Sequence, residues 1–148
     1  MVITQVKKEK RGTDLLKGLL AVWESSVRAT HDFLKEGDVE YLRPYVEQGL
    51  QEVPLLFCLE ESGKHVGFLG MEGDSIEMLF VAAEFRSLGI GSALMREALS
   101  RGALHVDVNE QNPQALGFYR HFGFEVTDRD DMDGLGLPFP ILHCELKK

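Results

Sequence analysis

Three apolar segments separated by two short turns occupy the middle of the chain and place the strongest constraint on its fold. The segments span Leu55–Glu60, His65–Met71 and Ile76–Val81. Each of the two turns, Glu61–Lys64 and Glu72–Asp74, contains a glycine, which favours the tight backbone of a hairpin. Three consecutive strands joined by such turns predict an antiparallel meander.

A glycine-bearing loop and a helix follow the meander. The loop Arg86–Gly91 comes soon after the third strand, and apolar periodicity predicts a helix over Ser92–Arg101. Gly102 can end that helix, and Leu104–Val108 then alternates as a strand does. The segment is therefore expected to form a β-loop-α-β unit.

The N-terminal third predicts one edge strand and two helices. Val2–Val6 has the pattern of the strand, and Thr13 or Asp14 can cap the first helix. The second helix is expected over Asp38–Leu50 with a break at Pro44, because proline disturbs a helix interior. The first helix carries apolar residues at helical spacing, namely Leu15, Leu16, Leu19, Leu20, Trp23 and Val27.

The C-terminal part begins with a well-marked helix. Asn112 is a good N-cap, Pro113 suits the first helical position, and the helix should run to His121 with Gly123 as its stop. The remainder is expected to form a strand, an acidic loop, a turn and a closing strand, over Phe124–Thr127, Asp128–Asp133, Gly134–Gly136 and Pro138–Leu146. No repeat or linker interrupts the chain, so residues 1–148 are expected to form a single α/β domain with a mixed sheet.

Charge and composition limit the possible partners. The formal net charge is −8, which disfavours nucleic acid because such affinity comes mainly from neutralising phosphates. A cationic small molecule or peptide fits better. No apolar run approaches the roughly 20 residues that cross a bilayer, and Met1–Gln5 lacks the apolar stretch of a signal peptide. We therefore expect no membrane partner and a cytoplasmic location. Cys58 and Cys144 lie far apart in apolar surroundings and match no redox or zinc spacing, so both are expected to be free, buried thiols.

The loop Arg86–Gly91 has the features of a phosphate-binding turn. Where a strand ends and a helix begins, several unpaired backbone N–H groups converge, and the helix dipole favours negative charge there. Gly89 and Gly91 carry no side chain that would keep an anion away, and Arg86 adds a positive charge. Taken alone, a tight turn explains the same glycines.

Two signatures in the same order resemble those of the GNAT superfamily of acetyltransferases. The acetyl-CoA motif of that superfamily has Arg or Gln, two residues, Gly, one residue, and then Gly or Ala; Arg86, Gly89 and Gly91 match it. A second signature is an Asn, then Ala, then Phe-Tyr before Gly-Phe. It is matched by Asn112, Ala115, Phe118, Tyr119, Gly123 and Phe124.

Three further segments resemble the bacterial YjaB-type branch of that superfamily, namely Val22–Leu34 (VWESSVRATHDFL), Asn109–Tyr119 (NEQNPQALGFY) and Pro138–Leu142. The resemblance implies the GNAT fold, which has a central mixed, mostly antiparallel sheet splayed at its middle and helices on both faces. It also implies acetyl-CoA as the cofactor, held in the cleft of the sheet.

The resemblance further implies which residues bind that cofactor. The backbone of Leu79, Phe80 and Val81 would bind the pantetheine arm, and one of these N–H groups would act as an oxyanion donor. Asn112 would fix the arm or the strand beside it, with a plain N-cap as its alternative role. Arg86 would support the pyrophosphate, which would lie on the N–H groups of Ser87, Leu88, Gly89, Ile90, Gly91 and Ser92.

Tyr119 matches the general acid of the family, and the alternative is an amphipathic core tyrosine. A phenol has a pKa near 10 and a thiol one near 8.5, so complete proton transfer to a CoA thiolate is uphill by roughly 2 kcal/mol. A hydrogen bond from Tyr119 to the leaving sulfur is at least as suitable a role.

The attacking amine must lose a proton, so a general base is useful. Glu77 precedes Met78–Val81, where some GNAT enzymes carry a glutamate base. A solvent-facing strand residue is the alternative reading of Glu77, and His31 and Asp107 are alternative bases. The histidines have no metal-binding spacing, so no metal is expected.

These features predict an amine N-acetyltransferase whose acceptor is a small molecule or a peptide. An acyl-CoA sensor without efficient turnover is the alternative, because it would keep the same cofactor loop. A nucleotide-phosphate enzyme fits poorly, since the Lys-Ser/Thr ending of a P-loop is absent after Gly91. Both a monomer and a homodimer through an edge strand remain open.

Overall fold

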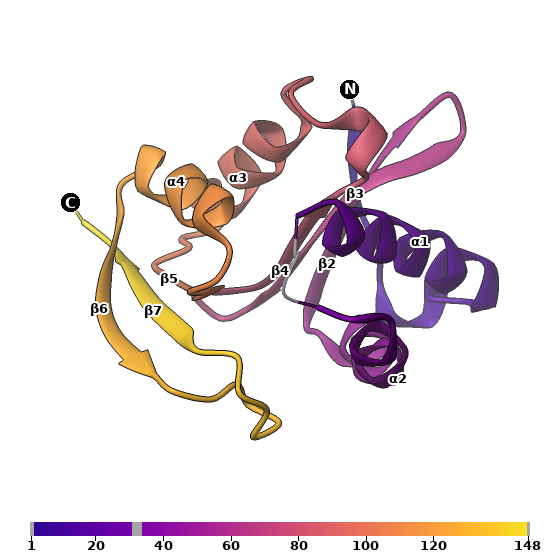
Figure 1. The fold of residues 1–148 in the computed structure, drawn as a ribbon. Coiled ribbons are helices and arrows are strands. Elements are labelled where there is room, and N and C mark those ends of the chain that lie inside the picture. Colours follow the sequence, from indigo (N-terminus) through magenta and orange to yellow (C-terminus); the bar gives the residue numbers. More distant parts are fainter. Residues whose placement is uncertain (1, 31–33, 148) are drawn as a thin grey trace.

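A seven-stranded mixed sheet forms the centre of the molecule (Figure 1). The computed structural model describes residues 2–30 and 34–147. The strands are β1 Val2–Gln5, β2 Leu55–Glu61, β3 Lys64–Glu72, β4 Ser75–Val81, β5 His105–Asn109, β6 Phe124–Asp130 and β7 Ile141–Leu146. The helices are η1 Lys8–Lys10, α1 Thr13–Thr30, α2 Glu36–Glu52, η2 Ala83–Phe85, α3 Ile90–Ser100 and α4 Pro113–His121.

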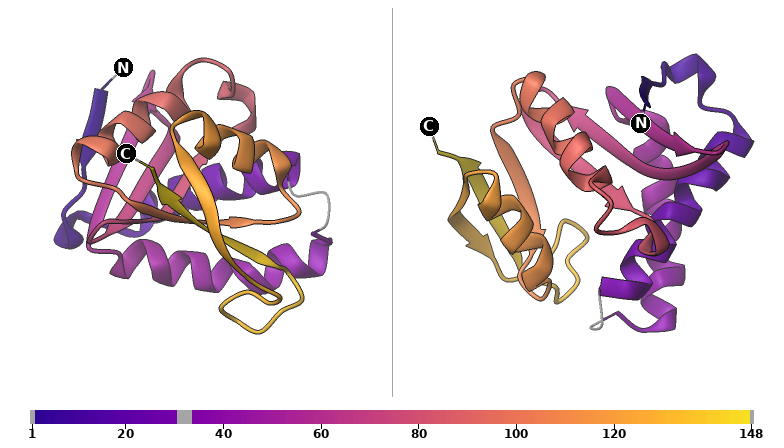
Figure 2. Two further views of the ribbon diagram at one scale, coloured as in Figure 1. Left: turned by 90° about the vertical axis from the view of Figure 1, so that its left-hand side faces the viewer. Right: turned by 90° about the horizontal axis from the view of Figure 1, so that it is seen from above.

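The sheet is split at its middle. Its strand order is β1-β2-β3-β4-β5-β7-β6, and every neighbouring pair is antiparallel except β4 and β5. These two parallel strands pair only through Ser75 with His105 and Ile76 with Val106. Figure 2 shows the two halves of the sheet diverging beyond this junction. From Glu77 onward, the β5-facing edge of β4 therefore has no strand partner among the residues that the structure describes.

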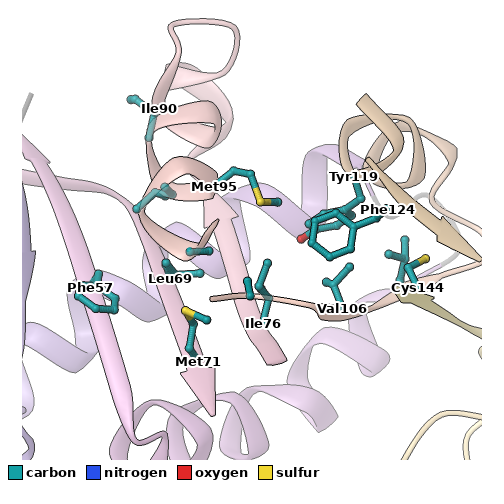
Figure 3. Close-up of a cluster of buried hydrophobic side chains, with 14 of the residues drawn as sticks. Phe57, Leu69, Met71, Ile76, Ile90, Met95, Val106, Tyr119, Phe124 and Cys144 are labelled. Atoms are coloured by element: carbon teal, nitrogen blue, oxygen red, sulfur yellow. The ribbon is translucent and has the colours of Figure 1, made fainter. Parts of the chain in front are cut away.

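Helices cover both faces of the sheet and enclose two cores. The helices α1 and α2 lie on one face, over a cluster that includes Trp23, Leu50 and Phe68. The helices α3 and α4 lie on the other face, over a cluster that includes Met95 and Phe124 (Figure 3). The expected fold class, a splayed mixed sheet with helices on both faces, is thus confirmed.

The predicted meander and its turns are also present. Ser62 and Gly63 both have positive φ, 51° and 77°, as a two-residue hairpin with a primed turn requires. Asn112 caps α4, with its side-chain oxygen accepting the N–H of Ala115 at 3.2 Å. The helix after the glycine loop begins slightly earlier than predicted, at Ile90.

The predicted break at Pro44 is wrong, because α2 runs without interruption from Glu36 to Glu52. A proline removes the hydrogen bond to the carbonyl four residues earlier, here that of Glu40. Both Pro44 and Glu40 are exposed, so water can solvate that carbonyl. The buried contacts of Val39 and Leu50 hold the helix against the sheet on the opposite side.

The predicted extent of the acidic loop is also wrong at its start. Asp128, Arg129 and Asp130 belong to β6, where they pair with His143, Leu142 and Ile141 of β7. Charged residues are tolerated there because β6 is an edge strand whose residues after Phe124 are all exposed.

A buried arginine fixes the end of α2. Arg11 is 8% exposed, and its guanidinium donates to the carbonyl oxygens of Leu50 at 3.1 Å and Val53 at 2.7 Å. It also donates to Val6 and Gln51. Cations stabilise helix C-termini, where carbonyls lack intrahelical partners. Arg11 therefore anchors the helix that forms one wall of the candidate site.

Candidate active site

A cavity of about 420 Å³ opens where β4 and β5 diverge. Its walls come from both strands, from the loop before α3 and from the start of α4. The cavity exposes the unpaired edge of β4, so that backbone N–H and C=O groups there are available to a ligand. The residues that line it on these elements include Glu77, Leu79, Phe80, Val81, Arg86, Ser87, Gly89, Gly91, Ser92, Asp107, Asn112, Gln114 and Tyr119.

The loop before α3 has the geometry of an anion site. Gly89 is the N-cap of α3 in the left-handed conformation, with φ 84°, and Ser87 also has positive φ, 65°. The first N–H groups of α3 have no acceptor within the helix, and among the described residues no side chain accepts from them. Arg86 lies beside them and donates to Gln114 at 2.7 Å.

The limited space around Gly91 explains why the second glycine position of the loop requires a small residue. A Cβ added there would lie 3.4 Å from Cε1 of Phe118, which is ordinary contact. Alanine would therefore fit at this position, in agreement with the Gly-or-Ala requirement of the motif. A larger side chain would have to displace Phe118 from α4.

The structure brings most of the predicted cofactor residues to this one cavity. The exceptions are Leu88, which is 61% exposed, and Ile90, which is 2% exposed and packs in the core. Neither side chain lines the cavity, so these two residues can serve a ligand only through their backbone N–H groups. Asn112 is both the N-cap of α4 and a lining residue, so its two predicted roles are compatible.

Tyr119 is both a core residue and a lining residue. Its ring is 8% exposed and packs edge-on against Phe118 and Phe124, at centroid distances of 5.3 and 6.0 Å. Figure 3 shows the ring beside Phe124, with the hydroxyl oxygen directed toward the β4 side of the cluster. Burial, together with nearby Cys144, raises the pKa of Tyr119 above its ordinary value. The hydroxyl therefore stays protonated and can donate a hydrogen bond into the cavity.

A β-bulge sets the position of Glu77. Across the β3–β4 pair, Met71 is opposite Ile76 and Gly70 is opposite Met78, so Glu77 is an extra residue without a partner. As a result, Ile76 packs under α3 and α4, whereas Met78 packs under α1 and α2. On a regular strand these two side chains would share one face. Bulges of this kind redirect side chains beside active sites.

The surroundings of Glu77 also shift the pKa of its carboxyl group. Partial burial, followed by the negative charges of Glu72 and Asp107, raises the pKa of the Glu77 carboxyl. A carboxylate whose ionised form is destabilised by its surroundings is a better proton acceptor, as a general base requires.

A second cavity of about 760 Å³ shares part of its wall, including Glu77, with the first. It lies between α1 and α2 on one side and the β6–β7 segment on the other. Four residues line both cavities, namely Glu77, Met78, Phe80 and Asn109. The rest of the second cavity is largely apolar, with three further carboxylates and one lysine, and includes Lys8, Trp23, Val27, Leu42, Tyr45, Val46, Glu52, Glu72, Asp133, Phe139 and Ile141.

One charged cluster near this junction is not evident from the sequence. His143 on β7 lies between Asp107 on β5 and Asp130 on β6. Residues of three strands cannot be assigned to one cluster without the strand order. The alternation of β7 could indicate only that His143 points to the face opposite the buried Leu142 and Cys144. The alternative base His31 falls outside the described residues.

Two further properties of the described residues bear on partners. No group of three His, Cys, Asp or Glu side chains in residues 2–30 and 34–147 has a geometry suited to a metal ion. No helix in those same ranges has the length and apolar character needed to cross a membrane.

Comparison with known proteins identifies the family. Residues 24–140 match the family model of the acetyltransferase (GNAT) domain. The chain is 42% identical over 126 residues to the peptidyl-lysine N-acetyltransferase YjaB of Escherichia coli (strain K12), an alignment that covers 84% of this chain and 86% of that protein.

Solved structures agree with this match. The solution structure of apo-form YjaB from Escherichia coli superposes with a TM-score of 0.83 at 38% identity, covering 98% of this chain and 97% of that one. The PaiA N-acetyltransferase of Thermoplasma acidophilum, crystallised with coenzyme A, shares the fold, with a TM-score of 0.67, 20% identity and full coverage of both chains. The chain therefore belongs to the GNAT family of acetyltransferases.

Proposed function

We propose that this GNAT acetyltransferase acetylates the side-chain amine of lysine in a peptide or protein. The observation that carries the proposal is that Glu77 lies in the walls of both cavities. One cavity suits the acetyl donor and the other suits a long aliphatic amine. The YjaB protein, which is 42% identical, is named a peptidyl-lysine N-acetyltransferase, and this supports the same acceptor class here.

Acetyl-CoA, the acetyl donor of the family, supplies an activated acetyl group bound to sulfur. The residues of the first cavity fit this molecule. The unpaired edge of β4 at Leu79–Val81 can bind an extended amide-bearing arm as an added strand would be bound. The open N–H groups at Gly89–Ser92 and the guanidinium of Arg86 suit a pyrophosphate.

The second cavity fits a lysine side chain. Apolar walls at Trp23, Leu42 and Phe80 can pack against its methylene groups. The carboxylates of Glu72 and Glu77 line the same space and attract an ammonium group. The acceptor amine would thus arrive beside the point where the two cavities join.

In the proposed mechanism, Glu77 takes a proton from the acceptor ammonium so that the neutral amine can attack the acetyl carbon. A lysine amine has a pKa of about 10.4, so its deprotonation near pH 7.5 costs roughly 4 kcal/mol without assistance. A backbone N–H on the free edge of β4 stabilises the negative charge that develops on the acetyl oxygen.

Tyr119 then stabilises the departing sulfur by a hydrogen bond. Because its pKa is raised by burial, full proton transfer from the phenol to a thiolate is even less favourable than for an ordinary tyrosine. The proton that the sulfur finally acquires therefore comes from the acceptor nitrogen. Tyr119 acts as a donor that keeps its own proton.

Acetyl transfer can be tested with three peptides of equal length. The first contains one lysine and a blocked N-terminus, the second replaces that lysine by arginine, and the third has no lysine but a free N-terminus. Mass spectrometry after incubation with acetyl-CoA should find one acetyl group on the first peptide alone. Modification of only the third peptide would assign the enzyme to N-terminal amines. Bound CoA with no transfer to any amine would instead support the sensor alternative.

A further inference from the structure

His143 bridges two aspartates on the face of the sheet that borders the second cavity. Its Nδ1 lies 2.7 Å from Oδ1 of Asp107, and its Nε2 lies 2.7 Å from Oδ2 of Asp130. Asp107 and His143 are direct partners across the β5–β7 pair. Alternation along β7 places Ile141 on the same face as His143, and Ile141 lines the second cavity.

One end of this cluster reaches the active site and the other reaches solvent. Asp107 lines the first cavity together with Glu77, and its charge contributes to the raised pKa of Glu77. The side chains of Asp107 and Asp130 are 63% and 67% exposed. Asp107, however, lies where a bound donor would cover it, whereas Asp130 lies on the edge strand β6. A series of hydrogen-bonded side chains, Asp107, His143 and Asp130, therefore leads from the cavity to the edge strand β6.

The reaction needs such an exit. An ammonium acceptor and acetyl-CoA give an acetylated amine, CoA in its thiol form and one free proton. Glu77 takes this proton but must lose it before the next turnover. Because Glu77 lines both cavities, bound donor and acceptor would shield it from bulk water.

We propose that Asp107 and His143 relay the proton of the acceptor amine from Glu77 to Asp130 and then to solvent. The proposal rests on the proposed function. Water in the cavity connects Glu77 to Asp107, since both line the same space. The imidazolium of His143 first gives its Nε2 proton to Asp130, which releases it to solvent and leaves a neutral imidazole protonated at Nδ1. Proton exchange with water moves that remaining proton to Nε2, and the freed Nδ1 then accepts the proton held by Asp107, which restores the imidazolium. Each residue then returns to its starting state, and one proton has moved outward.

The surroundings favour a protonated imidazole between the two aspartates. Hydrogen bonds to Asp130 and Asp107 raise the pKa of His143. Two further carboxylates face this region, since Asp128 is opposite His143 on β6 and Glu145 follows on the same face of β7. His105 lies on the same face of β5 as Asp107, opposite Glu145. Arg129, a cation beside Asp130 on β6, is engaged with Glu110 and Asp131.

A merely structural role for His143, as a tie between three strands, makes a different prediction from a relay. Loss of a tie would lower the melting temperature and would affect turnover equally in every buffer. Loss of a relay leaves proton release dependent on small buffer molecules, so turnover would rise with buffer concentration. His105→Gln is a matched control, because His105 is an exposed histidine on β5 outside the path.

The experiment measures kcat with acetyl-CoA and the lysine peptide for wild type, His143→Gln, Asp107→Asn and His105→Gln, at pH near 7 and over a range of buffer concentrations. In dilute buffer, we expect His143→Gln and Asp107→Asn each to lose roughly tenfold in kcat, below the usual effect of a direct acid or base. Concentrated imidazole buffer should restore most of this loss. The double variant should be no worse than the single ones, since both act on one path.

Wild-type kcat for His143→Gln at every buffer concentration would overturn the relay. So would a loss that no buffer restores, which would identify a structural tie. Failure of the proposed function is distinct, because it would appear as absent transfer to the lysine peptide by the wild-type enzyme.

Discussion

Met78 lies directly opposite Gly70 across the β3–β4 pair, while Glu77 beside it has no partner. A Cβ added to Gly70 would come within 2.8 Å of Cε of Met78 and 3.3 Å of Cγ2 of Val53. The absence of a side chain at Gly70 thus leaves room for Met78 in the wall shared by the two cavities.

Gly70→Ala should consequently change the acceptor cavity more than the fold. The end of the Met78 side chain is flexible and can move away from the new methyl group, at a modest cost in stability. We expect a several-fold higher KM for the lysine peptide and an unchanged affinity for CoA. The control is Gly37→Ala in α2, because Gly37 lines neither cavity and its added Cβ would lie in open space. Equal peptide KM values for the two variants would contradict this assignment.

Gly89→Asp should remove cofactor binding. The added carboxylate would place bulk and negative charge where the N–H groups of α3 are expected to meet the pyrophosphate. Titration calorimetry should find a loss of CoA affinity of at least about tenfold, equivalent to about 1.4 kcal/mol. Gly73→Asp is the matched control, since Gly73 also has positive φ and open space but lies in the β3–β4 turn. Unchanged CoA affinity in folded Gly89→Asp would refute the phosphate assignment.

Glu77→Gln should lower kcat most at low pH, where nearly all of the acceptor amine is protonated and a base is needed. At high pH more of the amine is already neutral, so the loss should shrink. A uniform loss across the pH range would assign Glu77 a positioning role instead of proton transfer.

The same variant should also be slightly more stable than the wild type at neutral pH. The pKa of Glu77 is raised in the folded state, so ionisation of this carboxyl opposes folding as the pH rises through that pKa. Glutamine removes this penalty. Melting curves should therefore differ near pH 7 and converge below the ordinary glutamate pKa of about 4.3. A lower melting temperature for Glu77→Gln near pH 7 would contradict the charge environment described here.

Tyr119→Phe removes one hydroxyl from a ring that is otherwise packed in the core. Because the hydroxyl is expected to act on the departing sulfur, kcat and kcat/KM should fall together by roughly 10- to 1,000-fold. The acetyl-CoA KM and the melting temperature should barely change. Full activity combined with altered stability would make Tyr119 a core residue alone.

The sequence predicted the meander, the cap of α4 and the glycine loop because the signals there are local, whereas the splay of the sheet was implied only by the resemblance to the GNAT family. The turn at Ser62-Gly63, the cap at Asn112 and the left-handed Gly89 each depend on a few adjacent residues. A match to family signatures then assigned roles to Tyr119 and Arg86 that no local rule supplies.

The parts that sequence could not predict depend on contacts between distant segments. Helix α2 continues through Pro44 because its other face is anchored by packing and by Arg11 at its end. The bulge at Glu77 exists only in relation to Gly70 on β3. The second cavity and the His143 cluster likewise require the placement of β7 next to β5.

The most direct test of the account is the affinity of a conjugate in which the lysine of a peptide is joined through an acetyl bridge to the sulfur of CoA. If the two cavities meeting at Glu77 hold donor and acceptor together, this conjugate fills both at once. Calorimetry should then find it bound roughly tenfold or more tighter than CoA alone, with part of this gain lost in Gly70→Ala. A conjugate that binds wild type no more tightly than CoA would contradict the central claim that the second cavity receives the lysine.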